Sequence, residues 1–537
     1  MYRKPRKPIF WKMLREIEKI KMEFAKENDP RTVGVFSEQL DSNLSFFRTK
    51  LNASADLVIR EFTLGIRPFR AALVFIDGLV DKKQIEWSIL DPMMHRENSP
   101  DTINFDLMAV IESRLVTVGE INRENDLDRL ADLILDGNTL LLVESILSAF
   151  VINTPGWEKR SIQQPDSEII IKGSREGFVE TLRSNTAMLR RYVSHPGLIF
   201  QNFTVGKKTR TQVSVAFIKG IADESMIQEI KKRIFAVNTD LILGSGVLEQ
   251  LVEDAPFSIF ATIGYSERPD VVSAKLLEGR AAIMVEGTPV ALTVPFLFIE
   301  NFQSPDDYNF RFMYGSLLRW IRYVSFVISL IGPAAYVALA TFHQELIPTP
   351  LLITMAASTE GTPFPTVIEA LAMGLIFEVI REGGIRLPKP IGQAISIMGA
   401  LVIGQATVQA GLVAAPTVIV VAVTAVTSFV IPTLQDEVTP LRVIMVILAG
   451  VLGAFGIVIG LLALLIHLVS LRSFGVPYLS PIAPENRRDL FQDVLIRAPW
   501  WAMFQRPSSL VKNNLKRQEF WQMPHASNRS NNGDENQ

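Results

Sequence analysis

The 537-residue chain contains no cysteine, which excludes disulfide bonds, thiolate metal sites and a cysteine nucleophile. Its five histidines are scattered, and His343 does not begin the His-Glu-x-x-His pattern of zinc hydrolases. The sequence has no glycine-rich phosphate-binding loop that ends in lysine. A net charge of −2 gives no indication of nucleic-acid binding. We therefore predict a protein that is not an enzyme and that uses neither a cofactor nor a metal.

Charge is scarce in one long stretch. The first 300 residues mix charged and apolar residues as a globular protein does, whereas residues 319–472 carry few charges. A helix needs about 20 mostly apolar residues to span a bilayer. We predict an all-α polytopic membrane domain over residues 315–475, with five spans at 321–342, 351–380 (broken), 391–411, 414–433 and 441–470.

Basic residues in short flanking segments predict the orientation of these spans. Arg319 and Arg322 precede the first span, so the N-terminal region is expected in the cytoplasm. Arg487 and Arg488 favour the same side for the tail, residues 476–537, whose end is predicted to be disordered. An odd number of spans, such as five, would place that tail outside the cytoplasm. One of these assignments must therefore be wrong, and the long run at 441–470 is the first to re-examine.

The second predicted span contains carboxylates and prolines. An intramembrane carboxylate usually faces a cavity, a pore or a partner helix, and a broken helix needs its freed backbone buried in protein or lining water. Glu369 is the strongest functional candidate, because Glu360 and Glu378 can instead lie at the two headgroup levels. The candidates for a pore or gate are Glu360, Gly361, Pro363, Pro365, Glu369 and Glu378.

The N-terminal half contains a repeat with an offset of about 142 residues. The pattern Phe-x-Glu-x-Leu-x-Ser-Asn at 36–43 recurs at 178–185, and Gly137 matches Gly279. Each copy reads as α/β, with a helical pattern followed by strands that end in turn-type glycines. We predict a soluble α/β region of two duplicated subdomains, 30–152 and 172–300, joined by a linker at 153–171. Residues 1–29 are predicted to form a basic helix or tail, either solvated or in contact with anionic lipid or a partner.

Several motifs resemble the A-subunit family of bacterial spore germinant receptors, the GerA-type spore germination proteins, over almost the whole chain. Two positions depart from the family pattern in the broken segment: Thr359, where arginine is usual, and Gly374, where glutamate is frequent. The motifs are Ser174-Arg175-Glu176-Gly177-Phe178, Glu267-Arg268-Pro269-Asp270, Leu277-Glu278-Gly279-Arg280, the run from Phe302 to Tyr308, the run from Phe342 to Pro348, the run from Glu378 to Pro388, Gly399 to Ala406 and Ser473 to Tyr478.

The resemblance implies a receptor in the inner membrane of the spore, assembled with a transporter-like B subunit that binds the nutrient and a lipoprotein C subunit. It further implies that the A subunit forms a homo-oligomer in membrane lipid and conducts ions when nutrient binds. The alternative is a secondary transporter that carries the nutrient itself. Transporters often have inverted repeats in their membrane segments, whereas the repeat here lies in the soluble half.

Charged residues within the motifs are candidates for subunit assembly. In the soluble half these residues combine charge with glycine or proline. The alternatives to subunit contact are a small-ligand site, or a helix start and an ion pair within the second subdomain. The candidates are Arg175, Glu176, Glu267, Arg268, Asp270, Arg381 and Arg386.

Overall fold

The computed structural model describes residues 36–64, 69–94, 108, 111–112, 121–156, 164–165, 168, 170–386 and 402–519. The predicted N-terminal helix at 1–29, the start of the predicted span 391–411 and the end of the tail lie outside these residues. The chain divides into two compact units, Met1–Ala53 with Leu57–Gly156, and Ser54–Asp56 with Trp157–Gln537. Each unit is described by itself.

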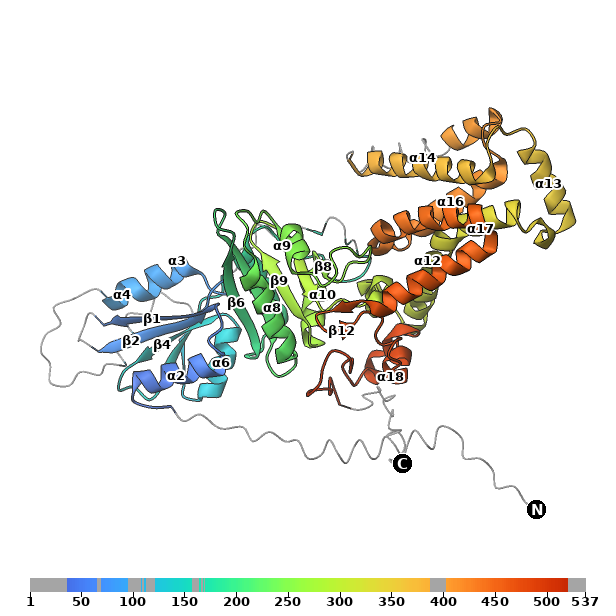
Figure 1. Cartoon of the computed structure of the whole chain (residues 1–537). Helices are drawn as coiled ribbons and strands as arrows, with labels where there is room; N and C mark the ends of the chain where they lie inside the picture. The colour runs from blue at the N-terminus through green and yellow to red at the C-terminus, as the bar shows by residue number, and fades with distance from the viewer. Residues whose placement is uncertain are drawn as a thin grey trace, which may run out of the picture. The chain divides into compact units, whose positions relative to one another are not determined.

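The first unit contains an antiparallel sheet whose described strands have the order β1-β2-β4-β5-β3. The central strands β2 and β4 are nearly continuous apolar runs, because helices cover both faces of the sheet (Figure 1). Its elements are α2 (Leu40–Lys50), β1 (Leu57–Thr63), β2 (Arg70–Ile76), α3 (Lys82–Ile85), η1 (Glu86–Leu90), α4 (Asp91–Met94), β3 (Ile121–Glu124), α6 (Leu127–Leu135), β4 (Asn138–Val143) and β5 (Ala149–Asn153).

The second unit begins with an α/β subdomain whose described strands have the equivalent order, β6-β7-β9-β10-β8. Its core is formed by the buried faces of α8, α9, β7 and β9 on one side and of α7 and α10 on the other. Its elements are α7 (Leu182–Tyr192), β6 (Leu198–Val205), β7 (Thr211–Ile218), α8 (Glu224–Ala236), α9 (Ser245–Val252), β8 (Gly264–Ser266), α10 (Pro269–Leu277), β9 (Ala281–Val285) and β10 (Ala291–Val294).

The sequence repeat coincides with repeated hydrogen bonds. The side chain of Asn43 accepts from the backbone N–H of Ser37 and donates to its carbonyl. Asn185 makes the same two bonds with Val179. The glycines Gly137 and Gly279 follow equivalent helices with φ of 90° and 92°, a conformation that favours glycine. The two α/β regions predicted from the repeat thus share strand order and local bonding.

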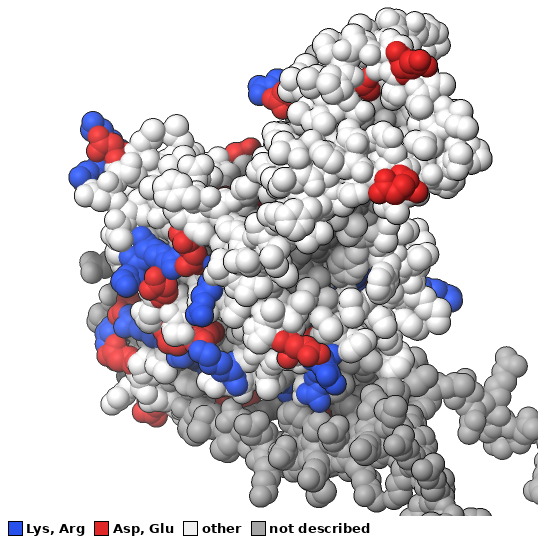
Figure 2. All heavy atoms as spheres, turned by 45° about the vertical axis from the view of Figure 1, so that its right-hand side comes forward, with Lys and Arg blue, Asp and Glu red and all other residues white. Residues whose placement is uncertain are grey.

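Helices form the rest of the second unit: α12 (Phe312–Thr341), α13 (Thr349–Thr359), α14 (Thr366–Arg386), a helix at 402–409, α16 (Ala415–Phe429) and α17 (Gln435–Ser470). Of the described helices, Phe312–Thr341 and Pro432–Ser470 are long and apolar enough to cross a membrane, whereas α16 is apolar but shorter. Figure 2 shows an almost uncharged surface in its upper part, where Figure 1 places α13, α14 and α16. Two of the five predicted spans therefore pass this test.

Helix α17 is not one straight span. Gly453 has φ 63° and ψ −143°, which interrupts the helix. A Cβ built on Gly460 would lie 3.1 Å from Cδ1 of Leu448, although twelve residues of straight helix would separate the two positions by about 18 Å. The residues before and after Gly453 therefore pack side by side as the two arms of a hairpin (Figure 1). The helix over the span predicted at 441–470 is therefore interrupted at Gly453, a turn that neither a proline nor a charge in the sequence indicates.

Both ends of α17 lie against the α/β subdomain of the second unit. Just before the helix, Thr433 Oγ1 donates to the carbonyl of Asn301 at 3.0 Å. Just after it, Ser473 Oγ donates to the carbonyl of Thr262 at 2.6 Å and accepts from the N–H of Phe296 at 2.9 Å. These contacts do not depend on the geometry of the turn at Gly453. They show that the two ends of α17 lie on the same side of the helical part, next to the subdomain.

The tail after α17 folds onto the same subdomain. Arg506 Nε donates to the carbonyl of Leu277 at 2.7 Å, and Arg517 pairs with Glu278 at 3.0 Å. If the helices between 312 and 470 cross a membrane, contacts of the subdomain with the segments on both sides of these helices favour an even number of crossings, and the number of spans stays a prediction. The elements of the tail are β11 (Arg472–Ser473), β12 (Val476–Pro477), α18 (Arg487–Asp489), η5 (Leu490–Val494) and η6 (Trp500–Ala502).

Candidate functional site

Two interruptions between helices meet in the helical part of the second unit. Residues 360–365 separate α13 from α14, and residues 410–414 precede α16. A Cβ on Gly411, whose φ is +65°, would lie 3.6 Å from the carbonyl oxygen of Gly361. The predicted break in the second span is therefore present, and a second break lies beside it.

Glu369 lies at this crossing, in the first turn of α14, and only 1% of its surface is exposed. Its Oε2 accepts from the N–H of Ala414 at 3.1 Å and from Oγ1 of Thr417 at 2.9 Å. The hydroxyl of Thr417 is also 3.0 Å from the hydroxyl of Tyr336 on α12. Glu369 thus caps the N-terminus of α16 from another helix, where the helix dipole favours a negative charge.

The second carboxylate oxygen of Glu369 is in a different environment. Oε1 is buried and has no hydrogen-bond partner among the described residues. A buried charged oxygen without a partner is costly, so this oxygen is suited to accept a bond from a group that moves. The other predicted residues of the break, Glu360, Gly361, Pro363 and Pro365, are exposed.

A second buried polar cluster joins α14 to α12 and α17. Glu378 pairs with Arg381 at 2.6 Å and with Arg442 at 3.5 Å. Arg442 in turn donates to the carbonyl and to the hydroxyl of Ser329, each at 3.0 Å. Glu378 therefore has two cationic partners, and one of them, Arg442, connects it to α12. Arg442 was not among the predicted site residues, because one arginine in an apolar run does not reveal its partner.

A third network lies where α12 leaves the α/β subdomain. Asp307, in α11 (Pro305–Asn309), pairs with Arg319 at 3.1 Å and with Arg322 at 2.7 Å. Arg319 also pairs with Asp493 of the tail at 2.9 Å, and Tyr308 donates to Asp493 at 2.8 Å. The side chains of Asp307 and Arg319 are fully buried. The network ties the subdomain, the first long helix and the tail together.

Burial changes the acidity of two members of this network that lie outside the apolar helices. It raises the pKa of Asp493 above the usual range even though Arg319 opposes the shift, and it raises the pKa of Tyr308 well above its ordinary value. The sequence indicated Arg319 and Arg322 only as basic residues that flank a span. The Asp306-Asp307-Tyr308 part of a family motif was the one signal that could have located the network.

Comparison with known proteins identifies the family. The model of the family described as Bacillus/Clostridium GerA spore germination protein matches residues 45–509. The chain belongs to the GerA family.

Among its relatives, spore germination protein KA of Bacillus subtilis (strain 168) is 42% identical over 493 residues, which cover 91% of this chain and 90% of the relative. Spore germination protein GerLA of Bacillus cereus is 38% identical, with 86% and 94% covered. The crystal structure of the N-terminal domain of the A subunit of the Bacillus megaterium spore germinant receptor GerK3 is 34% identical. The match covers 50% of this chain and 99% of the GerK3 domain, with a TM-score of 0.41.

Two motifs of this GerA-family chain meet inside the second α/β subdomain. The N–H of Phe178 donates to the carbonyl of Glu267 at 2.7 Å. The side chain of Arg268 is almost fully buried and donates to the carbonyl of Ser174 at 2.9 Å and to Asp270 at 2.7 Å. These contacts give both motifs a structural role within one chain.

The other assembly candidates have more exposed surroundings. Arg175 is exposed, whereas Glu176 accepts from Arg191 at 3.2 Å within the subdomain. Arg386 pairs with Glu382 at 2.6 Å on the surface of α14. Of the predicted assembly residues, Arg175 and Arg386 are thus the most accessible to another subunit, and their role in assembly stays a prediction.

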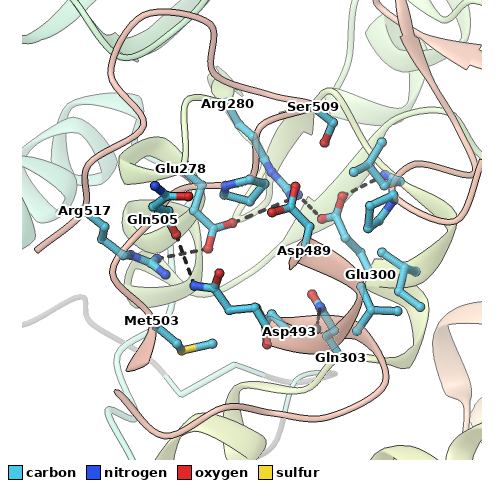
Figure 3. A pocket seen from close by; sticks show the side chains of 16 residues that line it. Glu278, Arg280, Glu300, Gln303, Asp489, Asp493, Met503, Gln505, Ser509 and Arg517 are labelled. Carbon is cyan, nitrogen blue, oxygen red and sulfur yellow. Dashed lines mark hydrogen bonds and ion pairs between the residues drawn. The ribbon is translucent and has the colours of Figure 1, made fainter. Parts of the chain in front are cut away.

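A small cavity of about 50 Å³ lies between this GerA-family subdomain and its tail. Figure 3 shows charged side chains that point toward one another across it, among them Glu278, Arg280, Glu300 and Arg517. Glu300 pairs with Arg280, and also with Lys275 at 3.1 Å. Burial alone would raise the pKa of Glu300, but Arg280 and Lys275 together lower it below its usual value. Most of the charged side chains that line the cavity are thus held in ion pairs within the chain.

Proposed function

We propose that this chain is the membrane subunit of a nutrient-germinant receptor, in which several copies assemble into an ion channel that opens when nutrient binds. Membership of the GerA family supports the receptor role. The transporter-like B subunit and the lipoprotein C subunit are the proposed partners, and the nutrient is bound by the former. The helices from 312 to 470 lie in the membrane, with the α/β subdomains and the tail together on the cytoplasmic side.

The observation that carries the proposal is the environment of Glu369. One of its oxygens caps α16 through Ala414 and Thr417, and the other has no partner in the described part of the chain. Intramembrane carboxylates are expensive and mark ion pathways or gates. Movement of α16 away from α14 breaks both bonds at once and exposes a carboxylate, and this is the proposed change between a closed and an open state.

The experiment is nutrient-triggered potassium release from spores that carry Glu369→Gln as their sole copy of the chain. The amide keeps the shape of the side chain and an oxygen that can cap α16, but it removes the negative charge. We expect release to be slowed or lost while the level of the protein and its assembly with the other subunits stay normal. Glu360→Gln is the matched control, because Glu360 lies in the same break but is exposed.

Unchanged release in the Glu369→Gln spores would make Glu369 a packing residue and would remove this part of the proposal. A secondary transporter is the alternative, since crossing interruptions of membrane helices are also found at the substrate sites of transporters. The two functions are separated by measuring uptake of labelled nutrient into vesicles that contain this chain without its partners. A channel subunit gives no saturable uptake, whereas a transporter does.

A further inference from the structure

Large apolar side chains are exposed around the end of the helical part that adjoins the α/β subdomain. They come from three separate segments: the first turns of α12, the tail, and the loop before Phe260. In that loop Phe257 is completely exposed, at 101%, and in α12 Met313 is 72% exposed. We refer to the set as the collar; its members are Met313, Leu317, Trp320, Ile496, Trp500, Phe257 and Ile259.

The three segments of the collar are held at the same end of the helices by specific contacts. The tail is joined to α12 through the N–H of Arg497, which donates to Oγ of Ser316 at 3.0 Å. Trp500 Nε1 donates to the carbonyl of Tyr308, just before α12, at 3.2 Å. The loop is joined to the last turn of α17, where Oγ of Ser258 is 3.0 Å from Nε2 of His467.

The length of α12 indicates what surrounds the collar. Its 30 residues extend about 45 Å, whereas the hydrocarbon core of a bilayer is about 30 Å thick. About ten residues of α12 therefore project from the hydrocarbon, and Met313, Leu317 and Trp320 lie within the first ten. The far end of α12 is close to the turn of the α17 hairpin, since Nε2 of His343 accepts from the N–H of Ala454 at 3.3 Å. The projecting end is thus the one that carries the collar.

The chemistry of the collar fits the boundary between lipid headgroups and acyl chains. Tryptophan is enriched at this level because its ring is apolar and its N–H is polar. Arg311 before α12 and Arg472 after α17 are both exposed, so the helix ends beside the collar carry cations that attract anionic headgroups. An exposed apolar patch of this kind that continues the apolar surface of the helices has lipid as its natural partner.

We propose that the collar lies in the headgroup layer and binds the α/β subdomain and the tail to the surface of an anionic membrane. The inference rests on the proposed membrane location of the helices. The partner is the lipid surface itself, and contact of the collar with a second protein is one of the outcomes that the test can detect. The collar sets the height of the subdomain above the bilayer through three segments that belong to no single element.

The absence of cysteine makes a direct test possible, because each single-cysteine variant carries one label. Phe257→Cys and Ile496→Cys place a polarity-sensitive fluorophore in the collar of the full-length chain, reconstituted in bilayer discs of phosphatidylcholine and phosphatidylglycerol. Val327→Cys, on the exposed face of α12, is the reference for the hydrocarbon core. Phe235→Cys is the matched control, because Phe235 is 75% exposed but packs on Phe203 of β6, the sheet edge opposite β8.

The readout is quenching by lipids that carry a nitroxide either near the headgroup or deep in the acyl chain. We expect the shallow nitroxide to quench the two collar labels about twofold more strongly than the deep one, and the reverse at position 327, because the two depths differ by roughly 10 Å. Position 235 should be quenched by neither.

Two other results have separate meanings. If the collar labels are quenched by neither nitroxide while position 327 is quenched by the deep one, the collar is not in lipid and the inference is overturned, with solvent or another copy covering it. If position 327 also escapes quenching, the proposed location of the helices in the membrane is itself wrong.

Discussion

Replacing Gly453 by alanine tests the hairpin in α17. At φ 63° and ψ −143° the backbone is in a region that residues with a Cβ avoid, at a cost of about 1–3 kcal/mol. The new Cβ would also lie 3.0 Å from Cβ of Phe342 and 3.2 Å from Nε2 of His343, which is closer than ordinary contact. We therefore expect Gly453→Ala to destabilise the helical part by about 2 kcal/mol or more.

Gly374→Ala is the matched control. Gly374 lies within α14, and a Cβ built there meets no atom within 4 Å. Alanine has the higher helix propensity, so this variant should be neutral or more stable by up to about 1 kcal/mol. The measurement is the temperature at which the purified chain in detergent loses solubility, with both variants compared with the parent. A lower midpoint is expected for Gly453→Ala alone, and equal midpoints would mean that α17 has no strained turn at this residue.

A cross-link gives a readout that does not depend on stability. In the cysteine-free chain, the double variant Leu448→Cys with Gly460→Cys should form an intramolecular disulfide under mild oxidation, because the two positions lie side by side across the hairpin. Disulfides form when Cα atoms are about 4.4–6.8 Å apart, whereas a straight helix would keep these residues about 18 Å apart. Failure to cross-link in a folded sample would refute the hairpin.

Three further predictions concern the base of the helices and the soluble subdomain. Arg319→Met should lower the free energy of unfolding by about 3–5 kcal/mol, because Asp307 stays buried and loses a partner. Arg386→Ala, which removes an exposed pair, should lower it by no more than about 1 kcal/mol. Thermal midpoints of both variants check this. Burial raises the pKa of Glu249 from 4.5 to about 7, so its carboxylate opposes folding increasingly as pH rises from 4.5 to 7. Glu249→Gln should therefore raise the midpoint at pH 8 and leave it unchanged at pH 4. Ser508→Cys should react with an impermeant maleimide from the same side of the membrane as a cysteine in α8.

The α/β half was the part most accessible to prediction, because its determinants are local and occur twice. The pattern that ends at Asn43 recurs at Asn185. The side chain of each asparagine accepts from the backbone N–H of the residue six positions before it. Glycines at equivalent turns repeat with it. The strand order was not predicted, since it depends on pairing between strands such as β2 and β4 that are far apart in sequence.

The helical half shows where reasoning from the sequence stops. Glu369 was selected as a candidate from the cost of an intramembrane carboxylate, but its bonds to Ala414 and Thr417, about 45 residues away, could not be predicted. The turn at Gly453 was missed because glycine within an apolar run is compatible with close packing of a straight helix. The folded tail and the network at Asp493 were missed because their contacts join residues far apart in the sequence. Asp493 and its partner Arg319 are separated by 174 residues.

Helix α12 contributes a side chain to each of three buried polar clusters in the helical part and at its base. It contributes Arg319 to the network at the subdomain, Ser329 to the cluster around Arg442, and Tyr336 to the cluster around Glu369. These contacts are 3.0–3.1 Å long, and hydrogen bonds weaken steeply when they are stretched. A shift of α12 along its axis by even one or two ångströms would therefore disrupt contacts at all three levels together. A helix held in this way changes between discrete positions rather than by gradual sliding. For the proposed channel we therefore infer that a signal from the subdomain or the tail would reach Glu369 as a switch between two arrangements.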